Sequence, residues 1–261
     1  MSTVIPQMGR PAPATSLGEI FAAHGHLREL IWRGGALAPT SLRTVASGHP
    51  SLDTELPSGG WPTRCLIELL SDHIGTGAMQ LLAPALRDGK RNILLLGFRW
   101  LPFPDGWAQL GIDPKRLLCV RATTQAEWVW ALERILQSRA LGAVLALPPL
   151  GDLLPVNHLR RLQSAAAESD ALSFVFRPVR AALNASPAPL RLKLAPTCNE
   201  KGLRTIDIQV LKRRGRPLDK TLRLSLPHPV MSPREITWNR HAVDRAGLPS
   251  PIPRQNIAAL A

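Results

Sequence analysis

The chain has 261 residues, of which 45% are hydrophobic, enough for one large domain or one domain with arms. Its formal net charge is +13, and its three cysteines form no CxxC pair. These properties argue against a disulfide-stapled secreted protein. No apolar run approaches the roughly 18 residues of a membrane span, and the first residues do not resemble a secretory signal. We therefore expect a cytoplasmic protein.

The positive charge is concentrated late in the chain. Residues 47–170 contain 12 basic and 12 acidic residues, whereas residues 171–226 contain 12 basic and 3 acidic ones, a net charge of +9. Segments 1–46 and 227–261 contribute +2 each. Such a basic region is typical of proteins that bind nucleic acid or an acidic protein partner, although charge can also serve solubility alone.

The first predicted element is an amphipathic helix over about 16–33. Ser16 and Glu19 form a capping box ahead of regularly spaced apolar residues, and a glycine pair follows the pattern. Its apolar stripe, which must pack on this chain or on a neighbour, includes Leu27, Leu30 and Ile31. We interpret residues 1–46 as an N-terminal arm that consists of this helix and a linker.

Strand and helix patterns alternate through the next part of the chain. Buried strands are predicted at 65–70, 91–97, 117–120, 141–147 and 172–176. The intervening helices include one that begins with a second capping box, Thr124 and Glu127. This alternation predicts a parallel sheet with helices on both faces.

The pattern changes after residue 176. Apolar and polar residues alternate at 190–194, 205–211 and 222–226, as in half-exposed antiparallel strands. We therefore predict an α/β core at 47–226, with a mostly parallel sheet and antiparallel strands at its C-terminal end. The Pro-rich segment 227–261 is predicted to be a flexible tail.

The loop after the first strand has the shape of a phosphate-binding loop without its side chains. Aligning the pattern G-x-x-x-x-G-K-[ST] from Ser71 puts Gly77 at the lysine and Ala78 at the hydroxyl residue. The residues of this degenerate nucleotide loop are Ser71, Asp72, His73, Gly75, Thr76, Gly77 and Ala78. The lysine that neutralises phosphate and the hydroxyl that holds Mg²⁺ are both missing.

The order of landmarks across residues 47–226 resembles the RecA recombinase core, a P-loop NTPase fold. The matching segments are Ser47-Gly-His-Pro-Ser-Leu-Asp, Gly59-Gly-Trp-Pro, Ile67-Glu-Leu-Leu, Leu110-Gly-Ile-Asp and Leu211-Lys-Arg-Arg. Within that superfamily the sequence resembles the ImuA family of RecA-like accessory proteins, which is related to the SulA division inhibitors. That closer match rests on residues 30–34, 59–62, 75–86 and 159–166.

The resemblance implies a place in the SOS response to DNA damage, in translesion DNA synthesis and mutagenesis. Proteins of this family act with RecA and with an inactive Y-family polymerase-like subunit, ImuB, and through it with an error-prone replicative-type polymerase. Non-specific contact with single-stranded DNA, through Arg180, Arg191 and Lys193, is a further expectation. We expect no metal and no membrane partner.

The same comparison argues against catalysis. ATP hydrolysis also needs an acid that activates water and an acid that holds Mg²⁺. The chain has Arg99 at the first position and Pro148-Pro149 at the end of the later strand, while the polar sensor corresponds to about Pro178. We therefore predict no enzyme activity and no required cofactor, and weak ATP binding without hydrolysis stays open.

A basic cluster follows the last long strand. It consists of Lys212, Arg213, Arg214 and Arg216, joined by Arg223, and we call these residues the basic edge. In RecA filaments, the residues that correspond to Lys212 and Arg214 reach the nucleotide of a neighbouring subunit. The N-terminal helix with Leu27, Leu30 and Ile31 likewise resembles the segment that docks one RecA subunit on the next.

These features favour a non-catalytic RecA-like adaptor that joins one end of a RecA filament. A solvated hairpin tip is the structural alternative for the basic edge. Two functional alternatives are a DNA-stimulated ATPase with an atypical nucleotide loop and a SulA-type inhibitor of cell division.

Overall fold

The computed structural model describes residues 43–72, 77–99, 102–149, 154–198, 204–215, 218 and 220–226. The predicted docking helix with Leu27, Leu30 and Ile31 and the predicted tail lie outside these residues. Within the described part of the chain, no helix is long and apolar enough to cross a membrane.

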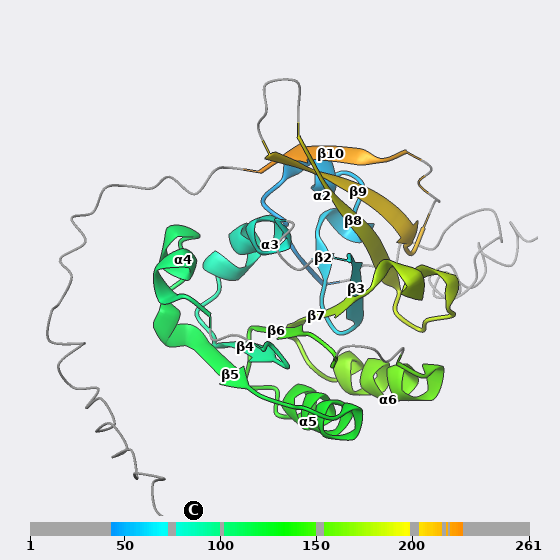
Figure 1. Ribbon diagram of the computed structural model, residues 1–261. Helices are drawn as coiled ribbons and strands as arrows, with labels where there is room; N and C mark the ends of the chain where they lie inside the picture. The colour runs from blue at the N-terminus through cyan, green and yellow to red at the C-terminus, as the bar shows by residue number, and fades with distance from the viewer. Residues whose placement is uncertain are drawn as a thin grey trace, which may run out of the picture. The chain divides into compact units, whose positions relative to one another are not determined.

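An eight-stranded sheet forms the centre of the fold (Figure 1). Its strand order is β10-β9-β8-β3-β7-β6-β4-β5. Neighbouring strands from β8 to β5 run parallel, while the pairs β8–β9 and β9–β10 are antiparallel. The predicted α/β class with a mostly parallel sheet is therefore confirmed.

The strands of the sheet lie within about two residues of their predicted ranges, except that β8 continues to Cys198, beyond the predicted 190–194. The strands of the sheet are β3 (Leu66–Leu70), β4 (Ile93–Leu96), β5 (Leu117–Val120), β6 (Ala143–Ala146), β7 (Leu172–Arg177), β8 (Leu190–Cys198), β9 (Arg204–Lys212) and β10 (Leu222–Ser225). The α-helices are α2 (Pro50–Asp53), α3 (Ala78–Arg87), α4 (Pro104–Gln109), α5 (Gln125–Gln137) and α6 (Val156–Ala167). Short 3₁₀ helices are η2 (Pro57–Gly59), η3 (Pro114–Arg116) and η4 (Val179–Leu183).

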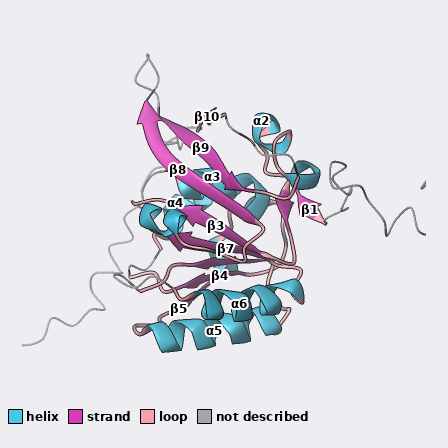
Figure 2. Ribbon diagram, turned by 90° about the vertical axis from the view of Figure 1, so that its right-hand side faces the viewer, coloured by secondary structure: helices cyan, strands magenta, loops and turns pink. Residues whose placement is uncertain are grey.

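Helices cover both faces of the parallel part of the sheet, as the alternation predicted. Helices α5 and α6 lie side by side on one face (Figure 2), where Leu66 of β3 packs with Trp128 and Leu159. Ile67 belongs to the second core, which includes Leu81 of α3. Successive residues of a strand point to opposite faces, so β3, buried on both faces, needs apolar residues throughout. Glu68 is the exception, and it marks the site described below.

Two short strands form a separate two-stranded ribbon. Strand β1 (Thr44–Val45) pairs antiparallel with β2 (Trp61–Pro62). Trp61 is fully buried and meets the ring of Phe174 edge-on at 5.3 Å between ring centroids. The last residues assigned to the linker of the N-terminal arm therefore take part in a packed element.

The prediction for 190–194 was wrong in part. Strands β9 and β10 are antiparallel and alternate buried with more exposed residues, as expected. Strand β8 instead runs parallel to β3 on one side, and its residues 190–192 are all buried. Arg191 looked like an exposed position in the alternating pattern, but it is buried because it pairs with Glu68.

Candidate functional site

Four neighbouring parallel strands end at one edge of the sheet, the edge where α/β proteins usually bind ligands. The residues that follow β3, β4, β6 and β7 there include Ser71, Arg99, Pro148 and Pro178. Among the described residues directly after these strands, Asp72 is the one carboxylate. Its Oδ1 atom accepts a hydrogen bond from the Val179 amide at 2.9 Å, so it fastens the loop after β7 to the loop after β3.

The described part of the predicted nucleotide loop, Ser71, Asp72, Gly77 and Ala78, ends in a closely packed helix start. His73, Gly75 and Thr76 lie outside the described residues. Gly77, the N-cap of α3, has a φ of +92°, a left-handed conformation that favours glycine. A Cβ atom placed on Gly77 would lie 2.4 Å from Leu226 Cδ1, so an apolar side chain occupies the space that a lysine side chain would enter.

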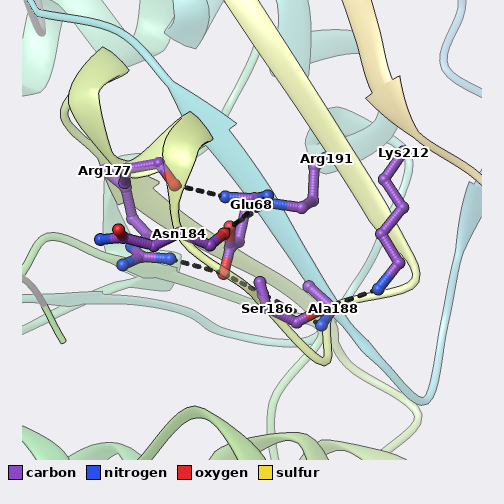
Figure 3. Close-up of polar contacts among 8 residues, drawn as sticks. Glu68, Arg177, Asn184, Ser186, Ala188, Arg191 and Lys212 are labelled. Carbon is purple, nitrogen blue, oxygen red and sulfur yellow. Dashed lines mark hydrogen bonds and ion pairs between the residues drawn. The ribbon is translucent and has the colours of Figure 1, made fainter. Parts of the chain in front are cut away.

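Beneath the loop after β7 lies a buried cluster of charged residues (Figure 3). Glu68 is fully buried and its two carboxylate oxygens are shared among three donors. Arg177 Nη1 donates to Oε1 at 3.0 Å, Ser186 Oγ donates to Oε1 at 2.6 Å, and Arg191 Nε donates to Oε2 at 2.7 Å. One carboxylate thus holds residues from β3, β7, β8 and the loop in a single network.

The cluster carries two guanidinium groups against one carboxylate. Arg177 is buried with its Nη2 atom lacking a hydrogen-bond partner among the described residues. Burying ionised groups costs several kcal/mol per ion, which a close pair and further hydrogen bonds must offset. Burial of the cluster therefore costs free energy. The clearest structural consequence of its hydrogen bonds is the fixed position of the loop above it.

Arg191 and Lys212 hold this loop, residues 178–189, by its backbone. Arg191 Nη2 donates to Ala181 O at 2.7 Å, and its Nη1 donates to Asn184 O at 3.2 Å. Lys212 Nζ donates to Ser186 O at 2.8 Å. The expectation that Arg191 contacts phosphate is therefore wrong, because Arg191 is buried and each of its three guanidinium nitrogen atoms donates to a group within the protein. Arg180 is exposed and Lys193 is half-buried.

The basic edge divides into two groups of residues. Arg213 donates to the backbone oxygen and the carboxylate of Glu55, and its side chain is 13% exposed. Lys220 Nζ reaches the same carboxylate at 2.6 Å, and these hydrogen bonds hold the pKa of Glu55 below its usual range, with Lys220 the larger cause. Arg213 therefore anchors β9 to the segment after α2.

Arg223 also forms an ion pair within the sheet. Its Nε and Nη2 atoms donate to the two carboxylate oxygens of Asp207 at 2.7 and 2.8 Å. This bidentate contact lowers the pKa of Asp207. Asp207 and Arg223 face each other across the β9–β10 pair, so the contact stabilises the outermost pair of strands.

Lys212 and Arg214 form the second group. Both are exposed, and neither forms an ion pair with a carboxylate in the described part of the chain. Burial raises the pKa of the Cys65 thiol to about 11, and the positive charge of Arg214 opposes that shift. Arg216 lies outside the described residues. The structure therefore separates two exposed cations that form no ion pair among the described residues from two that are paired with carboxylates.

Sequence reasoning missed the role of Glu68, which it treated only as part of a family landmark. A signal was present, because a lone carboxylate inside an otherwise apolar buried strand requires a buried partner. The partners lie 109 to 123 residues away in the chain, so spacing alone did not identify them.

No protein-family model matches the sequence. Among the described residues, no group of three or more histidine, cysteine, aspartate or glutamate side chains is placed to hold a metal ion.

Proposed function

We propose that this chain is a non-catalytic, RecA-like accessory protein of DNA-damage-induced translesion synthesis, as its resemblance to the ImuA family implies. In this proposal its sheet is a P-loop NTPase fold whose nucleotide loop has degenerated. The mixed sheet, in which the antiparallel pairs β8–β9 and β9–β10 follow a parallel series, is compatible with that fold. The packing of Leu226 at Gly77 and the involvement of Asp72 in a backbone contact support the loss of nucleotide chemistry.

The proposed partners are RecA and the inactive Y-family polymerase-like subunit, ImuB, in the cytoplasm. The observation that carries the RecA part is the division of the basic edge. Arg213 and Arg223 are paired with carboxylates of the protein, whereas Lys212 and Arg214 are exposed and form no ion pair among the described residues, at the two positions that the resemblance assigns to a neighbouring subunit. Exposed cations of this kind attract an acidic partner surface.

A charge-reversal experiment tests this proposal. The variant Lys212→Glu/Arg214→Glu should weaken binding to RecA filaments on single-stranded DNA by about tenfold or more, because attraction becomes repulsion. Biolayer interferometry with purified proteins measures the Kd. The matched control is Arg134→Glu/Arg160→Glu, which makes the same change of charge on exposed positions of α5 and α6. Equal affinity of the basic-edge variant and the unmodified protein would refute the assignment.

A further inference from the structure

The loop at residues 178–189 is held in one conformation by several independent contacts. Val179 is fixed by Asp72, and Arg191 holds the carbonyl groups of Ala181 and Asn184 from below. Ser186 is held twice, since its hydroxyl donates to Glu68 and its carbonyl accepts from Lys212. A surface loop does not need a buried ion cluster in order to connect two strands. The number of hydrogen bonds that fix this loop suggests that its conformation has a function.

The feature that this rigid loop presents is an exposed leucine. Leu183, at the end of η4, is 91% exposed, the highest value among the large hydrophobic residues that the structure describes as exposed. Because the loop is already held in one conformation, it loses little conformational entropy on binding. An apolar side chain on such a loop is suited to enter a pocket of a partner.

One basic residue lies on the same 3₁₀ helix as Leu183, and a second contacts the same loop. In a 3₁₀ helix the side chains three residues apart lie on the same face, which places the exposed Arg180 beside Leu183. Lys212 bonds to the same loop at Ser186. An apolar side chain with a cation beside it and a second cation on its loop complements an apolar pocket with carboxylates at its rim.

A protein partner fits this surface better than single-stranded nucleic acid does. Binding of bases relies on stacking against aromatic side chains, and residues 178–189 contain no aromatic residue. The methyl groups of Leu183 provide apolar contact without a face for stacking.

We propose that Leu183 is the apolar anchor of the surface to which the basic edge belongs, and that it enters an acid-rimmed pocket on RecA. This inference rests on the proposed function. It assigns RecA rather than the polymerase-like subunit because Lys212, one of the two cations assigned to RecA, is bonded to the loop that presents Leu183.

The test is the affinity of the full chain for RecA filaments on single-stranded DNA, with the polymerase-like subunit measured in parallel. The substitution Leu183→Ser should weaken RecA binding about thirtyfold, the loss expected on truncating an interface anchor. Leu183→Met should retain binding within about threefold, because it keeps an apolar side chain of similar volume. The matched control is Trp130→Ser on α5, another exposed apolar residue (63% exposed), which should leave the affinity unchanged.

The outcomes separate the two proposals. If the unmodified chain binds RecA and the basic-edge variant does not, but Leu183→Ser binds normally, the anchor assignment is wrong and the proposed function stands. If Leu183→Ser loses the polymerase-like subunit instead of RecA, the assignment of the partner is wrong. If the unmodified chain does not bind RecA, both proposals fail. Thermal unfolding should show the same Tm for Leu183→Ser and the unmodified chain, because Leu183 has almost no packing contacts to lose.

Discussion

Among single residues, Glu68 is expected to be the most sensitive to substitution. Glu68→Gln leaves the buried guanidinium groups of Arg177 and Arg191 without their carboxylate. Removing one partner of a buried ion pair costs about 3–5 kcal/mol. We expect a decrease of that size in the free energy of unfolding, measured with urea.

A surface ion pair provides the control for Glu68. Glu133 on α5 pairs with the largely exposed Arg161 on α6, and Glu133→Gln should change stability by about 0–1 kcal/mol. If Glu68→Gln lowered the free energy of unfolding as little as Glu133→Gln, the loop would not depend on the buried cluster.

Asp207 gives a prediction about pH. Its pair with Arg223 lowers the pKa of Asp207 in the folded protein relative to the unfolded chain. The pair therefore contributes stability above the ordinary aspartate pKa, about pH 4, and this contribution is lost as pH falls through the lower folded-state pKa. The substitution Asp207→Asn should flatten the acid limb of a plot of Tm against pH. If the acid limb keeps the same steepness in the variant, the Asp207–Arg223 pair does not contribute to stability.

At the level of elements, the start of α3 is predicted not to accommodate a lysine side chain. Gly77→Lys must adopt a positive φ, and its side chain must displace Leu226. The left-handed conformation alone costs roughly 1–2 kcal/mol for a non-glycine residue. We expect Gly77→Ala to destabilise the fold by more than this amount in urea unfolding.

A double-mutant cycle separates the two contributions at Gly77. In a Leu226→Ala background the collision with Leu226 is relieved, so Gly77→Ala should cost less there than in the unmodified protein. Equal costs in the two backgrounds would contradict the packing of Leu226 against Gly77.

Local features of the elements were predictable from sequence, whereas the pairing between distant elements was not. Strand β5 coincides with its predicted range, and the capping box of α5 is present, with Thr124 Oγ1 accepting from the Glu127 amide. Both depend on neighbouring residues only. Arg191 was misread because its burial depends on Glu68, and the anchoring of Arg213 was missed because Glu55 is 158 residues away. Periodicity contains no information about such pairs.

At the scale of the whole molecule, the proposed function predicts a lack of turnover. Purified protein with ATP, Mg²⁺ and single-stranded DNA should release phosphate no faster than buffer alone. The candidate site has glycine rather than lysine at position 77, and its one described carboxylate, Asp72, accepts a hydrogen bond from the Val179 amide. An intact recombinase measured in the same assay is the positive control. Turnover comparable to that control would favour the alternative of a DNA-stimulated ATPase.

The position of β3 between β7 and β8 also determines when the fold can close during synthesis. Strand β3 is made early, yet both of its neighbours in the sheet come from residues more than 100 positions later. Until they emerge from the ribosome, the edges of β3 are unpaired and Glu68 has no counter-ion. Pairings this distant in sequence slow folding and leave unpaired strands exposed to aggregation in the meantime. Fragments that end before residue 190 should therefore be insoluble when expressed alone.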